Sequence, residues 1–148
     1  MTASAHLQLT DAVMAALTAS PPVADIVKRG RAVPAQLTAA TVAAVRLIRS
    51  TGTRLSLDGQ ATTWHTAVAI EMGARAAANS DGHAAVDPVL QAAYTRICAQ
   101  PIAGGAWEWA GEPEIHWQLD EADTTVGLVT IVLPIQHIAG STLTPLNT

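Results

Sequence analysis

The sequence predicts an α+β protein in which two helices flank a mostly antiparallel sheet of about four to five strands. Three observations predict this fold. Apolar residues recur with a helical period in two separate segments, side chains alternate strictly along residues 62–73, and turn formers divide the rest into short β-rich pieces. The expected element order is α-β-β-β-α-β-β, with both helices packed on the sheet.

The first helix is expected to begin at Ser4 or His6 and to end at Ala19. Its apolar residues fall at i, i+4, i+7 and i+8, which places them on one stripe: Leu9, Val13, Ala16 and Leu17. The Ser20-Pro21-Pro22 segment ends the helix, because proline cannot continue it and restricts the residue before it.

Three extended segments follow. We expect Val23–Val33 to be a turn that enters a strand and Val42–Arg49 to be the next strand. Ser50-Thr51-Gly52 is typical of a turn, after which Arg54–Leu57 resumes pairing before an Asp58-Gly59 turn. The third segment is the clearest strand: Thr62, Trp64, Thr66, Val68, Ile70 and Met72 alternate with Thr63, His65, Ala67, Ala69, Glu71 and Gly73.

The second helix is expected beyond the loop 79–82, which can cap it, and before Gln100-Pro101. Pro88 then belongs to its first turn. One stripe of this helix carries Val86, Leu90, Ala93 and Ile97. The single cysteine, Cys98, is expected to be a small core residue, and it excludes an internal disulfide.

The remaining chain predicts a connector and a closing hairpin. The connector Gly104–Gly111 contains Trp107 and Trp109, of which at least one is exposed in a monomer. It is either a contact surface or a loop folded back over the core. The strands are Glu114–Leu119 and 124–137, and Trp64 and Trp117 are expected to anchor the core. We expect a single domain over residues 1–138 and a loose tail over 139–148.

Composition favours a folded protein of the cytoplasm without a membrane span. Apolar residues make up 49% of the 148 residues and charged residues 14%, which excludes disorder by composition. The N-terminus lacks the pattern of a secretory signal, and the longest apolar run, Val126–Ile135, is too short to cross a bilayer.

Charge is divided between the two parts of the chain, although the net charge is only −4. All eight cations precede residue 97, whereas the six acidic residues after it have no cation among them: Glu108, Glu112, Glu114, Asp120, Glu121 and Asp123. This split is either chance in a small sample or a sign of head-to-tail self-association, in which two different faces of one subunit meet.

No pattern of residues predicts an active site, a cofactor site or a metal site. The chain lacks a phosphate-binding loop, a dinucleotide fingerprint, a nucleophile elbow and a pair of histidines at metal-binding spacing. Asp120, Glu121 and Asp123 have the composition of a cation-binding turn but lack the calcium-loop glycine and glutamate, so a solvated turn is favoured. We therefore expect no enzyme, no cofactor and no bound metal.

The order of elements resembles that of the tail terminators of long-tailed bacteriophages, the lambda-like minor tail protein U family. The residues that carry the resemblance are the opening helix His6–Leu17, the strand Ala43–Leu47, the Leu57-Asp58-Gly59 element, Thr63-Trp64 with Ile70-Glu71, and Trp117 with Asp120-Glu121 before the last strand. The similarity covers residues 6–138. The second helix lacks the aromatic-rich face common in the family, the connector is longer and the tail is extra.

The resemblance implies a virion protein that is assembled in the host bacterial cytoplasm. It forms a ring, expected to be a hexamer, at the head-proximal end of the tail. Such a ring ends polymerisation of the tail tube protein, offers a docking surface to a head completion or connector protein, and lets genomic DNA pass without sequence-specific binding.

We hypothesise that the ring contact uses the divided charge. Arg46, Arg49 or Arg54 of one subunit would face the Asp120–Asp123 turn of its neighbour, with Trp107 and Trp109 as apolar contacts. The alternatives are another head–tail joining or tail completion ring protein, a small cytoplasmic ligand-binding domain with a pocket near the two tryptophans, and, least favoured, an enzyme.

Overall fold

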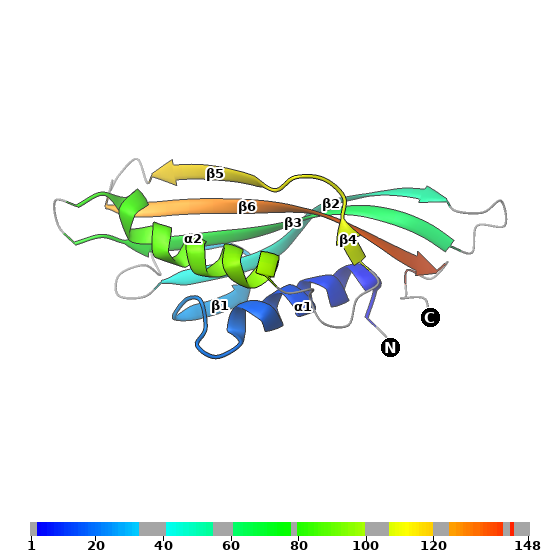
Figure 1. Ribbon diagram of the computed structural model, residues 1–148, viewed down its shortest axis with the longest axis horizontal. Helices are drawn as coiled ribbons and strands as arrows, with labels where there is room; N and C mark the ends of the chain where they lie inside the picture. The colour runs from blue at the N-terminus through cyan, green and yellow to red at the C-terminus, as the bar shows by residue number, and fades with distance from the viewer. Residues whose placement is uncertain are drawn as a thin grey trace.

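The computed structural model describes residues 3–32, 41–54, 61–77, 80–99, 107–119, 125–140 and Leu143. Their elements are α1 (Ala5–Thr18), β1 (Ile26–Arg29), β2 (Val42–Arg54), β3 (Ala61–Arg75), α2 (Gly82–Ala99), β4 (Trp107–Trp109), β5 (Glu114–Leu119) and β6 (Val126–Gly140). Figure 1 shows the long strands of one sheet with both helices on the same side of it.

The predicted α+β class is confirmed. The sheet has the order β1-β2-β3-β6-β4, with β5 also paired to β6, and every pairing is antiparallel except that of β1 with β2. Six strands form, rather than four to five, because part of the expected connector pairs with β6 as the short strand β4.

The centre of the sheet is the pair β3 and β6. The two strands pair in continuous register over fifteen residues, from Ala61 opposite Gly140 to Arg75 opposite Val126. β6 therefore extends to Gly140, so Ala139 and Gly140 of the expected tail belong to the sheet. Beyond them, the carbonyl of Leu143 accepts a hydrogen bond of 2.7 Å from the backbone N–H of Ala5.

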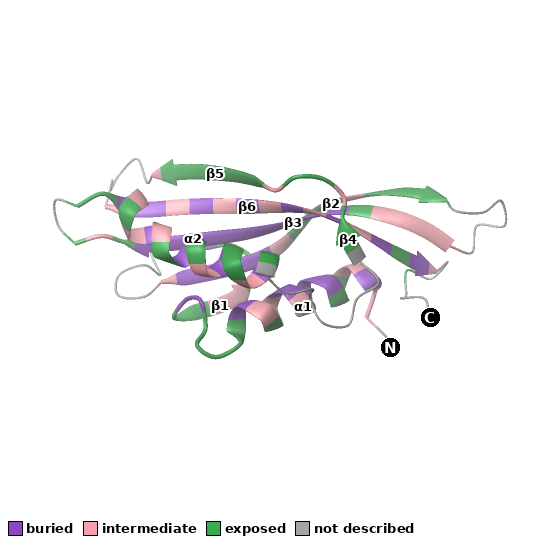
Figure 2. Ribbon diagram, viewed as in Figure 1, coloured by how far each residue is buried: buried purple, intermediate pink, exposed green. Residues whose placement is uncertain are grey.

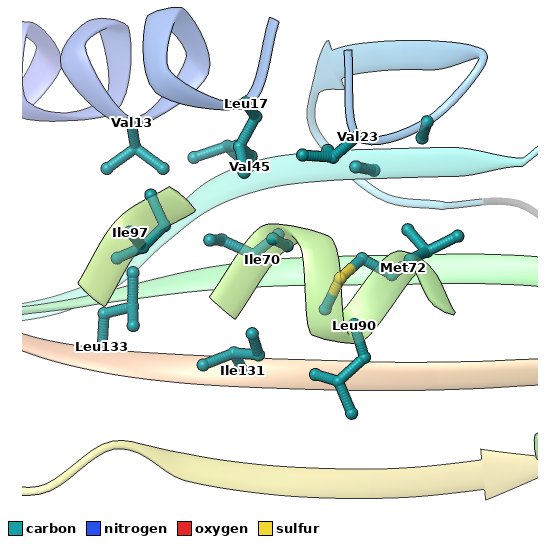
Figure 3. Close-up of a cluster of buried hydrophobic side chains, with 14 of the residues drawn as sticks. Val13, Leu17, Val23, Val45, Ile70, Met72, Leu90, Ile97, Ile131 and Leu133 are labelled. Atoms are coloured by element: carbon teal, nitrogen blue, oxygen red, sulfur yellow. The ribbon is translucent and has the colours of Figure 1, made fainter. Parts of the chain in front are cut away.

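The core lies between this sheet and the two helices. Figure 3 shows side chains from α1, α2, β2, β3 and β6 meeting in one layer, among them Val13, Leu17, Ile70, Ile97 and Leu133. All five are buried. The stripes predicted for both helices are the ones that face the sheet, and the capping Ser4 accepts a hydrogen bond from the N–H of Leu7 at 3.2 Å.

Arg96 joins the two helices. Its guanidinium donates hydrogen bonds to the carbonyl groups of Ala16, Ala19 and Pro21, which lie at the end of α1 and in the turn after it. The last carbonyls of a helix have no partner inside it, so a cation from α2 satisfies them here.

Three local predictions are wrong. β2 runs without a break through Ser50-Thr51-Gly52, where a turn was expected. The glycine there serves a different purpose: a Cβ on Gly52 would lie 2.9 Å from the indole of Trp64, its cross-strand partner, so glycine makes room for that ring. Pro88 lies beyond the first turn of α2, which begins at Gly82, and its ring is on the exposed side.

Cys98 is the third difference. It is exposed on α2, whereas its neighbour Ile97 enters the core. The helical stripe in the sequence was correctly placed, but one further residue turns the side chain about 100° around a helix of 3.6 residues per turn. The expectation of a core cysteine is therefore incorrect.

The N-terminus of α2 rests directly on β6 at Gly127, which gives a prediction about stability. A Cβ at Gly127 would collide with the carbonyl oxygen of Gly82, a backbone atom that cannot rotate away. We expect Gly127→Ala to lower the free energy of unfolding by at least about 1–3 kcal/mol, as overpacking does. Chemical denaturation measures this change.

Gly111→Ala is the matched control, because its Cβ would meet only the ring of Pro134 at 3.8 Å. We expect its free energy of unfolding to stay close to that of the parent protein. Equal stability of the two variants would show that α2 does not pack on β6 at this point.

Candidate subunit interface

The sheet has two sides along which strand pairing stops. β1 pairs only with Val42–Val45, so the outer side of β2 from Arg46 to Arg54 has no strand beside it in the described part of the chain. At the opposite side, β4 and β5 pair with β6 alone, and no described strand covers their outer sides. We call these stretches the β2 edge and the β4/β5 edge.

Both edges expose large apolar side chains. On the β4/β5 edge the exposed fractions are 46% for Trp109, 42% for Ile115 and 46% for Trp117. On the β2 edge they are 38% for Leu47 and 41% for Ile48. Figure 2 shows β5 exposed along almost its whole length, next to β6, whose residues mostly alternate between buried and intermediate. Large exposed apolar groups on a sheet edge indicate a contact surface.

The strand register places the basic and the acidic parts of the sequence at opposite edges of the sheet. Arg46 lies opposite Ala69, Ala69 opposite Val132, and Val132 opposite Glu114. These four residues form one row across the face of the sheet away from the helices, and its ends are about 14 Å apart, three strand spacings. Basic residues thus lie on the β2 edge and acidic residues on the β4/β5 edge.

Arg46 has a role within the subunit that the sequence did not reveal. Its guanidinium lies 3.9 Å from the carboxylate of Glu71, which is buried in the sheet, and Arg31 approaches the same carboxylate at 3.5 Å. The backbone N–H of Ala32 donates a further hydrogen bond to Glu71 at 2.8 Å. Because a buried carboxylate must be compensated, we assign Arg46 to Glu71 of the same chain.

Arg49 and Arg54 remain as the exposed cations of the β2 edge. Neither forms an ion pair with another residue that the structure describes. Arg49 points to the face away from the helices, opposite Ala67, and Arg54 lies near the end of β2 opposite Thr62. Figure 1 shows that this end of β2 and β3 extends beyond both helices.

The acidic partners proposed from the sequence lie outside the described residues: Asp120, Glu121 and Asp123, together with the side chain of Trp107. The described acidic residues of the same edge are Glu108, Glu112 and Glu114, all exposed. Glu108 and Glu114 belong to β4 and β5 themselves. They therefore carry the charge of this edge in the structure.

The prediction that Trp117 anchors the core is wrong. Trp117 is on the same side of the sheet as the helices, but β5 is the outermost strand there. Its indole contacts the ring of His83 at the start of α2, with ring centroids 5.4 Å apart, and otherwise stays largely exposed. Trp64, by contrast, is half-buried between β2 and α1. The alternation of residues predicts on which face of the sheet each tryptophan side chain lies, but not which element covers that face.

The remaining histidines and carboxylates do not form a chemical centre in the described part of the chain. His65 is hydrogen-bonded to Gln136 at 3.1 Å, and His116 contacts Glu114 at 3.2 Å, both on the surface. The described residues hold no group of three or more potential metal ligands. Neither described helix has the length and hydropathy that crossing a membrane requires.

The structure contains a histidine pair that the sequence did not indicate, in which His137 is buried and His6 is half-buried. His6 of α1 packs edge-on against His137 of β6 and against Trp64, with ring centroids 4.8 and 5.0 Å apart. The Nε2 of His137 shares a hydrogen bond of 2.7 Å with Thr66, which is bonded in turn to Ser50. No sequence signal marks this pair, because its members come from opposite ends of the chain.

No protein-family model and no curated protein matches the sequence. The interpretation of the surface therefore depends on the geometry of its two edges.

The histidine pair gives a prediction about pH. Burial, and then the neighbouring charge of His6, lower the pKa of His137 from 6.5 to about 4, and burial also lowers the pKa of His6. The folded protein thus binds fewer protons than the unfolded chain. The contribution of this pair to the free energy of unfolding should be present in full above pH 6.5 and should fall as the pH drops towards about 4.

We expect His137→Gln, which keeps a hydrogen-bonding group near Thr66 but does not titrate, to flatten this dependence. Unfolding midpoints measured between about pH 7 and about pH 5 test it, on either side of the usual histidine pKa, with the exposed His65→Gln as control. An unchanged slope in His137→Gln would exclude the histidine pair as its cause.

Proposed function

We propose that this chain is a structural subunit that associates head to tail into a closed ring, and that the ring is the tail terminator of a long-tailed bacteriophage. The observation that carries the proposal is the pair of free sheet edges with opposite charge and exposed apolar residues. A contact between two different surfaces of the same subunit forms a ring when its rotation closes.

The two kinds of side chain have different roles in this contact. Exposed ion pairs contribute only about 0.2–1 kcal/mol each, so Arg49, Arg54, Glu108 and Glu114 set orientation and disfavour wrong contacts. Affinity comes from burial of apolar area, to which Trp109, Ile115 and Trp117 contribute most. Tryptophan is a frequent anchor of such interfaces.

The terminator assignment rests on the resemblance in element order, together with this geometry. It places the ring, six subunits by analogy, at the head-proximal end of the virion tail. One surface of the ring would cap the tail tube and another would bind a head completion or connector protein. DNA would pass through the opening without base recognition. The proposal assigns no catalytic residue, cofactor or metal.

Tube capping tests the function. The protein is added to the polymerising tail tube protein of the same phage, and tube length and end occupancy are measured by electron microscopy. We expect shorter tubes with the protein at one end only. Tubes of unchanged length, or protein bound along their sides, would contradict the terminator assignment.

A pair of variants links capping to the edge. Ile115→Ser with Trp117→Ser removes the apolar part of β5, and we expect capping to be lost because the ring no longer forms. Tyr94→Ser, which removes an exposed aromatic residue of α2 away from both edges, should cap as the parent protein does. Circular dichroism of each variant verifies that the fold is retained.

A further inference from the structure

We infer that neighbouring subunits join by strand pairing, in which β5 of one copy pairs antiparallel with the free stretch of β2, Arg46–Arg54, of the next copy. This inference rests on the proposed ring and specifies how its subunits meet. It makes the sheet continue from one subunit to the next.

The backbone provides the first argument. Strands at a sheet edge present N–H and C=O groups that another strand can satisfy, and this is a common mode of protein recognition. β1 occupies the side of β2 only up to Val45, where the N–H of Gly30 donates to its carbonyl. Five of the six residues of β5, 114–118, fit the nine-residue space in line with β1, and Leu119 reaches the end of β1.

The direction of pairing follows from the topology. β2 is antiparallel to β3, β3 to β6, and β6 to β5, so β5 runs opposite to β2. Copies around a ring have the same orientation relative to its axis. β5 of one copy therefore meets β2 of the next in the antiparallel sense.

The side chains match when the two sheets share their faces. Ile115 and Trp117 lie on the helix side, as does Leu47 of β2, whereas Glu114 and Arg49 lie on the opposite face. The best apolar match places Trp117 opposite Leu47 and Ile48, where β2 has a bulge. Glu114 then lies opposite Thr51, within diagonal reach of Arg49.

This register is compatible with ring closure. Within one subunit Glu114 is level with Arg46, whereas in the contact it is level with Thr51 of the next copy. If the bulge is taken into account, each copy is displaced along the strand direction by about 14–17 Å relative to the copy before it. Across the strands, each copy has a width of four strands, about 19 Å. The resulting tilt of about 40° lies within the roughly 35–45° of closed barrels.

β1 is the competing edge, and the geometry disfavours it. Within one subunit His116 is level with Lys28. Pairing of β5 with β1 of the next copy, in the register that centres the two strands on each other, would therefore again place His116 opposite Lys28, with no displacement along the strands. Strands without tilt do not close into a barrel. In addition, Arg29 of β1 is already paired with Asp11 of α1.

Disulfide trapping between copies tests the inference. In a Cys98→Ser background, chains with one cysteine in β5 are mixed with chains with one cysteine in β2 and oxidised. We expect Glu114→Cys with Thr51→Cys, and His116→Cys with Arg49→Cys, to give on the order of tenfold more mixed dimer than other pairs, because only facing Cβ atoms reach disulfide geometry.

Two control pairs complete the experiment. Ile115→Cys with Thr51→Cys should not cross-link, because these side chains lie on opposite faces, and His116→Cys with Lys28→Cys reports the β1 contact. Cross-linking through Lys28→Cys would overturn the pairing of β5 with β2 but not the ring. The same conclusion would follow if Cys98→Ser chains form rings in which none of the β5–β2 cysteine pairs cross-links. Failure of the parent chain to form rings, even on tail tubes, would instead overturn the proposed function, and the pairing with it.

Discussion

The fifteen-residue pairing of β3 with β6 is the constraint on which the rest of the structure depends. It fixes the centre of the sheet, and it fixes which side chains face the helices and which face away. Both helices cover one face of this pair, and Arg96 ties them to each other. Because the central strands are paired and covered in this way, unpaired backbone groups lie at the two edges, together with several of the exposed large apolar side chains, among them Leu47, Trp109 and Ile115.

Because of that arrangement, the division of charge along the sequence becomes a division of charge across the sheet. Residues that precede and follow position 97 could have been interleaved across the sheet, but the order of strands places β2 and β5 on opposite sides of the central pair. Opposite charges on opposite edges favour association of different surfaces and disfavour the meeting of like edges. A closed ring also protects the edges, which in an open chain of copies would keep recruiting strands.

Much of the fold could be predicted from periodicity. The helix stripes, the long alternating strand and the α+β class follow from which residues must face a core. The uninterrupted course of β2 could not be predicted, because Gly52 is typical of a turn and its actual reason, space for Trp64, is a contact across strands. The exposure of Trp117 was equally hidden, since alternation does not say which strand is outermost. Of the residues proposed for the interface, Arg49 and Trp109 are exposed at edges of the sheet, whereas Arg46 neutralises the buried Glu71, a residue distant in sequence.

The most direct test of the central claim, that the basic and the acidic edge meet, is the mass in solution of charge-reversed variants, by light scattering across salt concentrations. Arg49→Glu alone and Glu114→Arg alone should each reduce the ring, most at low salt. The two reversals in one chain should restore it, because every contact again joins opposite charges. Thr95→Arg, on the exposed side of α2, should leave it unchanged. A doubly reversed chain no better assembled than the single variants, or single variants that assemble like the parent, would contradict the account.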